Sequence, residues 1–505
     1  MTAWQLLLLG LYVPLAALLT LYGVHRVHML VSYLWHRRRN PSPNGVLRRL
    51  PTVLVQIPVF NERTVVERIL KAVARFDYPR SLLSVQVLDD STDETVGIAR
   101  RACGRLAERG LEVEHVHRDR RDGFKAGALA NGLRRSDADL VAIFDADFVP
   151  RPDFLQKLVP YFADARVGCV QARWEHLNLG RNLLTRIQTF FLDGHFILEH
   201  SYRHRTGRIF NFNGTAGIWR RSCIDDAGGW SANSITEDTE ISFRAQLRGW
   251  RFVYLRDETC PAEVPADIDA YKGQQHRWAK GYTEVLRQHF GTIWRASIPV
   301  KAKVEATLML SNHFAFLLLG ALTILHLPVV LVRAHFGSGA LLGFLDLAGL
   351  NLALFAFFVF YAVSQWEAGR FTLRRLALLP LSIGLGMALM VNSSRAVLES
   401  LFGVRTGFVR TPKEGRGDDG RESRYRASSA FGQALVEVAF GAYLLGSSAY
   451  LLRRGHIGGV GLTLLVAWGF LYLGFGTLRN RLLRPSGPAP EPLPVPEAAP
   501  ATESA

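Results

Sequence analysis

Long apolar stretches lie toward the two ends of the chain, and shorter ones alternate with polar residues between them. Residues 4–24 are almost purely apolar, and four later stretches are also long enough to cross a bilayer, which takes roughly 20 apolar residues. These later stretches cover residues 308–332, 340–364, 431–452 and 458–478. The pattern predicts one membrane span before, and four after, a soluble region at residues 50–300.

Within residues 50–300, apolar runs rich in β-branched residues alternate with helical patterns. Such alternation predicts an α/β domain with a mostly parallel sheet, in which ligands bind beyond the carboxyl ends of the strands. Two acidic clusters, Asp89-Asp90 and Asp145-Ala146-Asp147, directly follow predicted strands. The predicted strands are 52–60, 83–88, 111–117 and 140–144, and the predicted helices are 62–75, 92–109 and 125–134.

Charged residues beside the apolar stretches predict their orientation. Arg37 to Arg39 follow the first stretch and no basic residue precedes it, the reverse of a signal peptide, so we expect an uncleaved anchor with its N-terminus outside. The arginine-rich loops 366–375 and 403–426 should both be cytosolic. Segment 376–401 between them, apolar over 376–391, cannot then cross once and must lie at the membrane interface or re-enter; we count it as an interfacial segment between the third and fourth spans.

The net charge of +16, from 60 Lys and Arg against 44 Asp and Glu, could indicate nucleic-acid binding. The basic residues, however, flank apolar segments, which favours cytosolic loops and no nucleic-acid partner. Four cysteines show neither a CxxC motif nor zinc-ligand spacing, so neither a disulfide framework nor a zinc site is indicated. The tail at 485–505 is rich in Pro, Ala and Glu and is predicted to be disordered.

Asp145 and Asp147 are candidate metal ligands. Alternate carboxylates at a strand end can share Mg²⁺ or Mn²⁺ with substrate phosphates, and the cation offsets charge on a departing nucleoside diphosphate. The alternative for this pair is a simple turn. Asp89 and Asp90 could contact the base and ribose of a nucleotide, or they could form an Asx turn with Ser91.

Lys125 lies among small residues that permit close backbone approach, where it could neutralise phosphate or be an ordinary surface lysine. Thr236-Glu237-Asp238 precedes a helix predicted at 241–248, so a capping role is one interpretation. The other makes Asp238 a general base that removes the proton of an attacking sugar hydroxyl. Direct displacement with one base inverts the anomeric carbon, so an α-linked nucleotide sugar would give a β-linked product.

Gln274 to Trp278 combine a cation with an aromatic face. Arg277 suits bidentate phosphate contact, and Trp278 could stack on a sugar ring or be an interfacial belt residue. His195, His200 and His204 match no metal-ligand spacing, and residues 190–202 predict an amphipathic helix on the membrane surface.

Taken together, these motifs resemble glycosyltransferase family 2, and specifically the processive cellulose-synthase-like enzymes of the mannan and glucan synthase-like branch. The resemblance covers residues 50–480. It rests on the segments QVLDDSTD (86–93), FKAGAL (124–129), DAD (145–147), FNGTAGIWR (212–220), TED (236–238) and QQHRW (274–278).

The resemblance implies a GT-A type nucleotide-sugar-binding domain inserted between transmembrane helices, a divalent cation, and transfer coupled to translocation of the polymer. Asp89, Asp90, Lys125, Asp145, Asp147 and Arg277 would bind the nucleotide sugar. Glu237, Asp238 and Trp278 would hold the acceptor. Phe408, Thr411 and Lys413 would belong to a gating loop, in which Arg410 and Pro412 depart from the cellulose synthase pattern.

The predicted function is therefore an inverting, processive β-glycosyltransferase that polymerises sugars. UDP-glucose is the first choice of donor, giving a β-1,4-glucan, and GDP-mannose, giving a β-1,4-(gluco)mannan, is the second. A non-processive glycolipid synthase and a transporter with a cytosolic binding domain are alternatives. The composition suggests a bacterial inner membrane, with a periplasmic export partner for the growing polysaccharide; in a eukaryote the location would be the Golgi.

The predicted organisation divides the chain into six parts. They are an anchor at 1–40, the catalytic domain at 50–300, a transmembrane hairpin at 305–365, an interfacial segment with the gating loop at 376–426, a second hairpin at 430–478 and the tail at 485–505.

Overall fold

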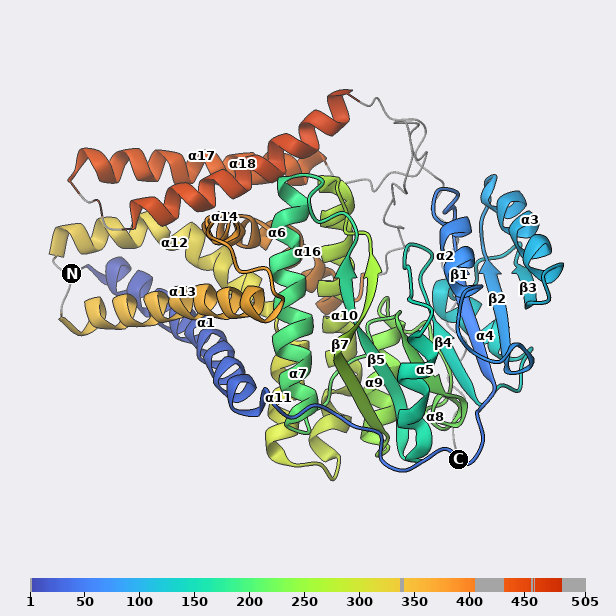
Figure 1. Cartoon of the computed structure of the whole chain (residues 1–505). Helices are drawn as coiled ribbons and strands as arrows, with labels where there is room; N and C mark the ends of the chain where they lie inside the picture. The colour runs from blue at the N-terminus through green and yellow to red at the C-terminus, as the bar shows by residue number, and fades with distance from the viewer. Residues whose placement is uncertain (1, 337–339, 405–430, 456, 458, 484–505) are drawn as a thin grey trace.

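The structure is a computed structural model that describes residues 2–336, 340–404, 431–455, 457 and 459–483, with side chains except at 333–353. A sheet domain occupies one side of the molecule, and a group of long helices projects away from it on the other (Figure 1). The predicted gating loop and tail lie outside the described residues.

The sheet has seven strands in the order β3-β2-β1-β4-β6-β5-β7. The first four by sequence confirm the predicted strands, and β1 pairs in parallel with both β2 and β4 while β2 pairs in parallel with β3. Strand β6 is antiparallel to both neighbours, and β5 and β7 are parallel to each other. The strands are β1 (Val53–Val59), β2 (Leu83–Asp89), β3 (Glu112–His117), β4 (Leu140–Ile143), β5 (Val167–His176), β6 (Gly217–Arg220) and β7 (Arg251–Ala262).

Helices cover both faces of this sheet, as the alternating pattern predicts. The predicted helices 62–75 and 92–109 begin later than expected, at Val66 in α2 and at Thr95 in α3, because turns follow the preceding strands. The covering helices are α2 (Val66–Val73), η1 (Arg80–Leu82), α3 (Thr95–Ala107), α4 (Phe124–Leu133), α5 (Phe154–Leu158), η2 (Val159–Ala163), α8 (Arg221–Asp226) and α9 (Glu237–Leu247).

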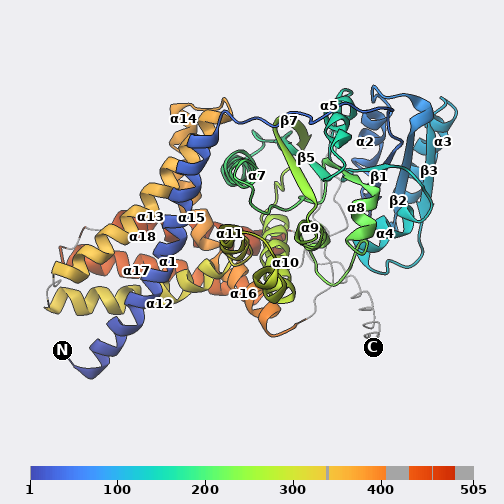
Figure 2. The ribbon, with the colours of Figure 1, turned by 90° about the horizontal axis from the view of Figure 1, so that it is seen from below.

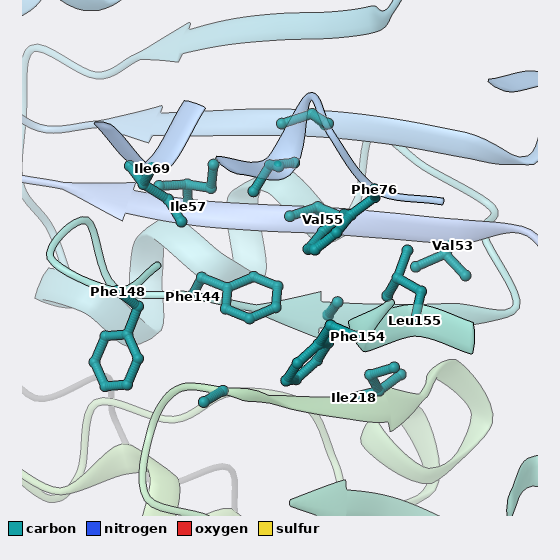
Figure 3. Packing of buried hydrophobic residues seen from close by; sticks show 14 of the residues in the cluster. Val53, Val55, Ile57, Ile69, Phe76, Phe144, Phe148, Phe154, Leu155 and Ile218 are labelled. Atoms are coloured by element: carbon teal, nitrogen blue, oxygen red, sulfur yellow. The ribbon is translucent and has the colours of Figure 1, made fainter. Parts of the chain in front are cut away.

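Aromatic side chains pack between the sheet and helices α2 and α5. Phe144, just after β4, meets Phe154 of α5 edge to face at 5.0 Å, and Phe76 stacks on Phe154 at 6.4 Å. Figure 3 shows these rings beside Val55 and Ile57 of β1. Each fully buried side chain of this kind contributes about 1.5–3 kcal/mol through removal from water. This core fixes the carboxyl end of β4, and Asp145 and Asp147 follow directly after it.

Residues 183–205 form three successive helical segments: α6 (Leu183–Asp193), the π-helical η3 (Gly194–Glu199) and α7 (His200–Arg205). The prediction of a membrane-surface helix at 190–202 is wrong. Phe190, Phe196 and Tyr202 are buried, because this segment lies between the sheet and the projecting helices and packs against α1, α13 and α15. Both of its faces are therefore covered by protein.

The 28-residue helix α10 (Ile268–Arg295) carries the Gln274–Trp278 motif and leads into α11 (Val300–Leu310). The predicted span 308–332 is interrupted by a turn at 311–313, so the apolar helix α12 (Phe314–Phe336) starts later. Helix α10 packs along α16, and both lie between the sheet domain and the long helices (Figure 2).

The projecting helices are α1 (Ala3–His36), α12, α13 (Ala340–Glu367), α17 (Phe431–Arg453) and α18 (Val460–Leu483). Segment 373–401 forms α14 (Leu373–Leu376), α15 (Leu379–Ala388) and α16 (Met390–Leu401). Gly469 of α18 allows backbone contact with α15, since a Cβ there would lie 2.1 Å from the carbonyl oxygen of Gly384.

Within the described residues, five helical segments are long and apolar enough to cross a membrane: Ala3–His36, Phe314–Val332, Leu373–Leu401, Phe431–Arg453 and Val460–Leu482. The number matches the sequence prediction, but the set includes Leu373–Leu401, which we expected at the interface. The part of α13 whose side chains are described, Leu354–Glu367, is apolar but shorter than these five segments. These features indicate a membrane protein, and the interfacial position of 376–391 stays a prediction.

Candidate active site

One cleft of about 210 Å³ opens where the carboxyl ends of β1, β2 and β4 meet α9 and α10, and we call it the central cleft. Its walls combine residues from sequence positions as distant as 58 and 278. The predicted site residues that line it are Asp90, Lys125, Asp145, Asp147, Glu237, Asp238, Gln274, Arg277 and Trp278. The structure therefore brings together most of the side chains that sequence reasoning singled out.

Asp90 lies just beyond β2 and is held by a bidentate contact with an arginine. Arg118 donates from Nε and Nη2 to its two carboxylate oxygens, over 2.7 and 2.6 Å, and Arg121 lies 3.7 Å from the same carboxylate. The Arg121 guanidinium also stacks over the ring of Phe60, 3.6 Å from its centroid. This wall of the cleft offers the cation of Arg121 and the aromatic ring of Phe60 to a ligand.

Asp89 is placed differently from its neighbour. Its fully buried side chain is not among the residues that line the central cleft. One carboxylate oxygen accepts the backbone N–H of Ser91 over 2.9 Å, and the other lies 2.8 Å from Nε2 of His115. Burial opposes ionisation of this carboxyl, but the bonds to His115 and Ser91 outweigh it and lower its pKa. These contacts support the Asx-turn interpretation, and direct contact of Asp89 with a nucleotide stays a prediction.

Lys125 stands at the centre of the cleft on the first turn of α4. Its Nζ donates to Asp145 Oδ1 over 2.5 Å and to the carbonyl oxygen of Gly214 over 2.9 Å. Burial disfavours its charge, but the Asp145 carboxylate more than compensates and raises the pKa of Lys125. The close backbone approach predicted here is real, because a Cβ on Gly127 would lie 2.0 Å from the carbonyl oxygen of Asp122.

Gly214 lies between the lysine and the predicted base. It has φ of +78°, a conformation that favours glycine, and a Cβ there would lie 3.0 Å from Asp238 Oδ2 and 3.3 Å from Lys125 Nζ. The glycine therefore lets both charged groups approach one backbone turn. We call residues 213–214 the catalytic turn.

The residues present are compatible with the predicted divalent cation. Among the described residues, no group of three His, Cys, Asp or Glu side chains is placed to hold a metal unaided. Asp145 and Asp147 nevertheless both line the cleft, and the Asp145 side chain is 36% exposed. Mg²⁺ in nucleotide sites typically uses one or two carboxylates together with substrate phosphates. This pair fits a cation that arrives with the donor diphosphate.

Glu237 and Asp238 form the first turn of α9, which begins earlier than the predicted helix at 241–248. Thr236 occupies the N-cap position without a side-chain capping bond. Burial, followed by the neighbouring charge of Glu237, raises the pKa of Asp238 to about 7, and burial also raises the pKa of Glu237. A carboxyl with a pKa near neutrality is suited to accept a proton.

Helix α10 presents Gln274, Arg277 and Trp278 to the opposite side of the cleft. Burial lowers the pKa of Arg277 to about 10, while the nearby Asp145 and Glu237 partly counteract this. The guanidinium therefore still carries its charge at neutral pH. Trp278 is half-buried in the cleft wall, which favours contact with a ligand over the belt-residue interpretation.

Membrane-side helices hold α10 in place. Lys272 forms a buried ion pair with Glu437 of α17 at 2.8 Å, and its backbone oxygen accepts a bond from Asn392 of α16. Asn480 of α18 donates to Asp267 and Asp269 at the helix start. The motif thus depends on the C-terminal helices for its position.

Several residues in or beside the central cleft went unrecognised in the sequence. Arg118 and Arg121 follow β3 in a basic stretch, and their position after a strand end could have suggested contact with the acidic clusters. Asn213 and Gly214 lie in a segment that carried the family resemblance but no assigned role. Trp174, Glu175 and His176, at the end of β5, also line the cleft. Phe408, Thr411 and Lys413 lie outside the described residues, so their gating role stays a prediction.

Comparison with known families points the same way. Residues 51–281 match the family model "Glycosyltransferase like family 2". This range contains every predicted residue of the central cleft.

Two curated relatives are plant enzymes. Glucomannan 4-beta-mannosyltransferase 7 of Arabidopsis thaliana is 42% identical over 251 residues, covering 49% of this chain and 45% of the relative. Glucomannan 4-beta-mannosyltransferase 1 of Oryza sativa subsp. japonica is 42% identical over 258 residues, covering 48% and 50%. The chain spans about half the length of the curated relatives it matches.

A solved structure shares the fold. The mannosyltransferase PcManGT from Pyrobaculum calidifontis, in complex with GDP-Man and Mn²⁺, aligns with 78% of this chain and 100% of its own, at a TM-score of 0.55 and 20% identity. At this identity the likeness establishes the α/β fold with flanking helices rather than the chemistry.

Proposed function

Because residues 51–281 match the family model "Glycosyltransferase like family 2" and share the fold of a solved mannosyltransferase, we propose that this protein is a membrane-embedded β-mannosyltransferase of GT-A type. It transfers mannose from GDP-mannose to the end of a β-1,4-linked mannan or glucomannan. The observation that carries the proposal is the placement of Asp238, with its raised pKa, beside Lys125 and Gly214 in the central cleft.

The choice of donor follows from the relatives. UDP-glucose was the first expectation from sequence, but three of the matched plant relatives are glucomannan 4-beta-mannosyltransferases, at 42–44% identity. Their aligned regions span about half of this chain, close in length to the catalytic domain. The activity named for these relatives favours GDP-mannose over UDP-glucose as the donor.

The chemistry is a single displacement. The acceptor hydroxyl gives its proton to Asp238, its oxygen forms a bond to the anomeric carbon of the donor, and the bond from that carbon to the diphosphate oxygen breaks. Lys125 and Arg277 offset the negative charge that develops on departing GDP. One displacement inverts the anomeric configuration, so α-linked GDP-mannose gives a β-linkage.

A divalent cation held by Asp145 and Asp147 would supply further charge compensation for the diphosphate. Trp278 would stack on the terminal sugar of the acceptor and so favour repeated addition to one chain. The apolar helices would place the domain at the cytosolic face of an inner membrane, or of a Golgi membrane in a eukaryote. An export partner for the polymer remains part of the proposal.

The test supplies membranes containing the protein with labelled GDP-mannose and UDP-glucose separately, with Mn²⁺ or Mg²⁺, and with membranes lacking the protein as control. We expect polymer from GDP-mannose that mannanase degrades and cellulase does not. Polymer made from UDP-glucose alone would replace the mannan assignment by the glucan one. A lipid carrying one or two sugars would exclude processivity, and no transfer from either donor would exclude the proposed activity.

A further inference from the structure

Buried and half-buried polar side chains form a continuous series of contacts from the central cleft to the N-terminal helix α1. None of them is used in the displacement described above. The series consists of Asn213, His195, Glu199, Arg203, Glu305 and His25, which we call the anchor network. It joins five parts of the chain: the catalytic turn, η3, α7, α11 and α1.

The cleft end of the network fixes the catalytic turn. Asn213 lines the cleft, and its side chain lies 3.2 Å from Nε2 of His195 and 2.7 Å from Nε2 of His200. The carbonyl of the next residue, Gly214, accepts the bond from Lys125. A shift of Asn213 would therefore move the backbone against which Lys125 and Asp238 are placed.

The middle of the network is centred on Arg203, which forms buried ion pairs with Glu199 and Glu305. His195 Nδ1 lies 3.2 Å from Glu199 on η3, and Arg203 contacts Glu199 at 3.4 Å. Arg203 also donates from Nε to Glu305 over 2.9 Å, and the side chains of Arg203 and Glu305 are only 4% and 3% exposed. Because burying an unpaired charge is costly, these groups restrict one another's positions.

The membrane end of the network is supplied by α1. Nε2 of His25 lies 2.8 Å from Glu305 Oε2, and Tyr202 donates to the same oxygen over 3.0 Å. The neighbouring Arg26 lies 4.0 Å from Glu199 and donates to Tyr361 of α13 over 2.8 Å. Helix α1 packs on both α7 and η3, and Figure 2 shows it on the side of α11 that faces away from the sheet domain.

The π-helical turn at η3 adds to this picture. Such turns occur often at functional sites, and this one carries both His195 and Glu199. Gly194 at its start lets α13 approach closely, since a Cβ there would lie 2.5 Å from the ring of Tyr361.

We propose that α1 is a positioning element of the active site, which acts through the anchor network to hold the catalytic turn in register with Lys125 and Asp238. This inference rests on the proposed function for its kinetic readout. His25 and His195 act as positioning residues, because neither is placed against the reacting atoms. Loss of either should lower kcat and leave the KM for the donor nearly unchanged.

A double-mutant cycle in the full-length protein tests the proposal, with His25→Ala, His195→Ala and the double variant assayed with GDP-mannose. Each single change is expected to lower kcat about 10-fold. If the two residues acted independently, their effects would add in free energy and the double variant would lose about 100-fold. Because they belong to one network, we expect the double variant to lose only about 10-fold. Additive losses, or kcat per folded enzyme equal to wild type in the single variants, would overturn it.

Two further variants make the test specific. Tyr22→Phe, one turn from His25, removes a contact of α1 with Ser311 that lies outside the network, so kcat should stay at the wild-type value. Glu305→Gln keeps the shape of the side chain but removes its charge. If His25→Ala does not fold, Glu305→Gln takes its place in the cycle. The loss of kcat in the Glu305→Gln and His195→Ala double variant should then be smaller than the product of the two single losses.

Hydrogen exchange provides a readout that does not need activity. The N–H groups of Phe212 and Asn213 donate to Ser242 and Gln171, over 2.9 and 3.1 Å. Exchange at these amides should be faster in His25→Ala and unchanged in Tyr22→Phe. Unchanged exchange in His25→Ala would refute the coupling whatever the donor. A wild-type protein without transferase activity would refute only the proposed function.

Discussion

The central cleft has a sheet wall, at the carboxyl ends of β2 and β4, and a helix wall, at the start of α9, and their carboxylates differ in whether a cation is paired with them. On the sheet wall, Asp90 is matched by Arg118 and Asp145 by Lys125, in close ion pairs. On the helix wall, Glu237 and Asp238 are adjacent carboxyls whose pKa values are raised by burial. Matched pairs keep fixed charges that can bind a nucleotide diphosphate, whereas a buried carboxyl next to another readily accepts a proton. The contrast separates binding from proton transfer within one cleft.

The largest expected effect comes from removing the base on the helix wall. Asp238→Asn should lower kcat by about 10²–10⁴-fold, because the amide cannot accept the hydroxyl proton. Binding of GDP should be retained, since the sheet wall is intact. Steady-state transfer and equilibrium binding of GDP measure the two effects. Asp225→Asn, a carboxyl outside the cleft, is the matched control, and full turnover by Asp238→Asn would refute the assignment of the base.

A smaller and different effect is expected on the sheet wall. Asp90→Asn replaces one partner of a charge-assisted pair that is worth about 1.5–3 kcal/mol, so the KM for the donor should rise about 10- to 100-fold. The kcat at saturating donor should change little. Asp93→Asn, in the same loop but not lining the cleft, serves as the control. A fall in kcat without a rise in KM would remove the distinction between the two walls.

The smallest effect concerns pH. Asp238 has a raised pKa of about 7, so it is protonated and inactive at acid pH, and kcat/KM should rise as the pH increases through about 7. Burial is the main cause and the charge of Glu237 the second, so Glu237→Gln should lower the pKa of Asp238 and move the acid limb down by up to about one pH unit.

The pH–rate profiles of wild type and Glu237→Gln decide this point. Glu258→Gln, which removes a carboxyl outside the cleft, should leave the profile where it is. A shift of the acid limb to higher pH in Glu237→Gln would contradict the repulsion between the two carboxyls.

Local pattern was sufficient for the sheet and for the strand-end acids. Strand and helix periods depend on neighbouring residues, and a parallel sheet gathers its carboxyl ends at one edge, so Asp90, Asp145 and Asp147 could be placed before the structure was known. The same reasoning failed at 190–202. An amphipathic pattern indicates an apolar face without indicating what covers it, and here protein, not lipid, covers the segment.

Contacts between residues far apart in the sequence could not be derived in the same way. The distinction between Asp89, which is turned into the fold toward His115, and Asp90, which faces the cleft, depends on how β3 pairs with β2. The raised pKa of Asp238 depends first on its burial, and then on charges from other elements, since Lys125 lowers this pKa and Asp145 raises it.

The sequence by itself determined the α/β domain, its apolar flanking helices, and the chemical types of the cleft residues, because each follows from local periodicity and spacing. Only the tertiary structure decided which of those residues share one cleft, which carboxyls are paired, and that α1 reaches the catalytic turn through buried charges. These features arise from contacts between residues far apart in the sequence, such as His25 with Glu305, 280 positions away. Local pattern does not encode which partner a buried charge meets.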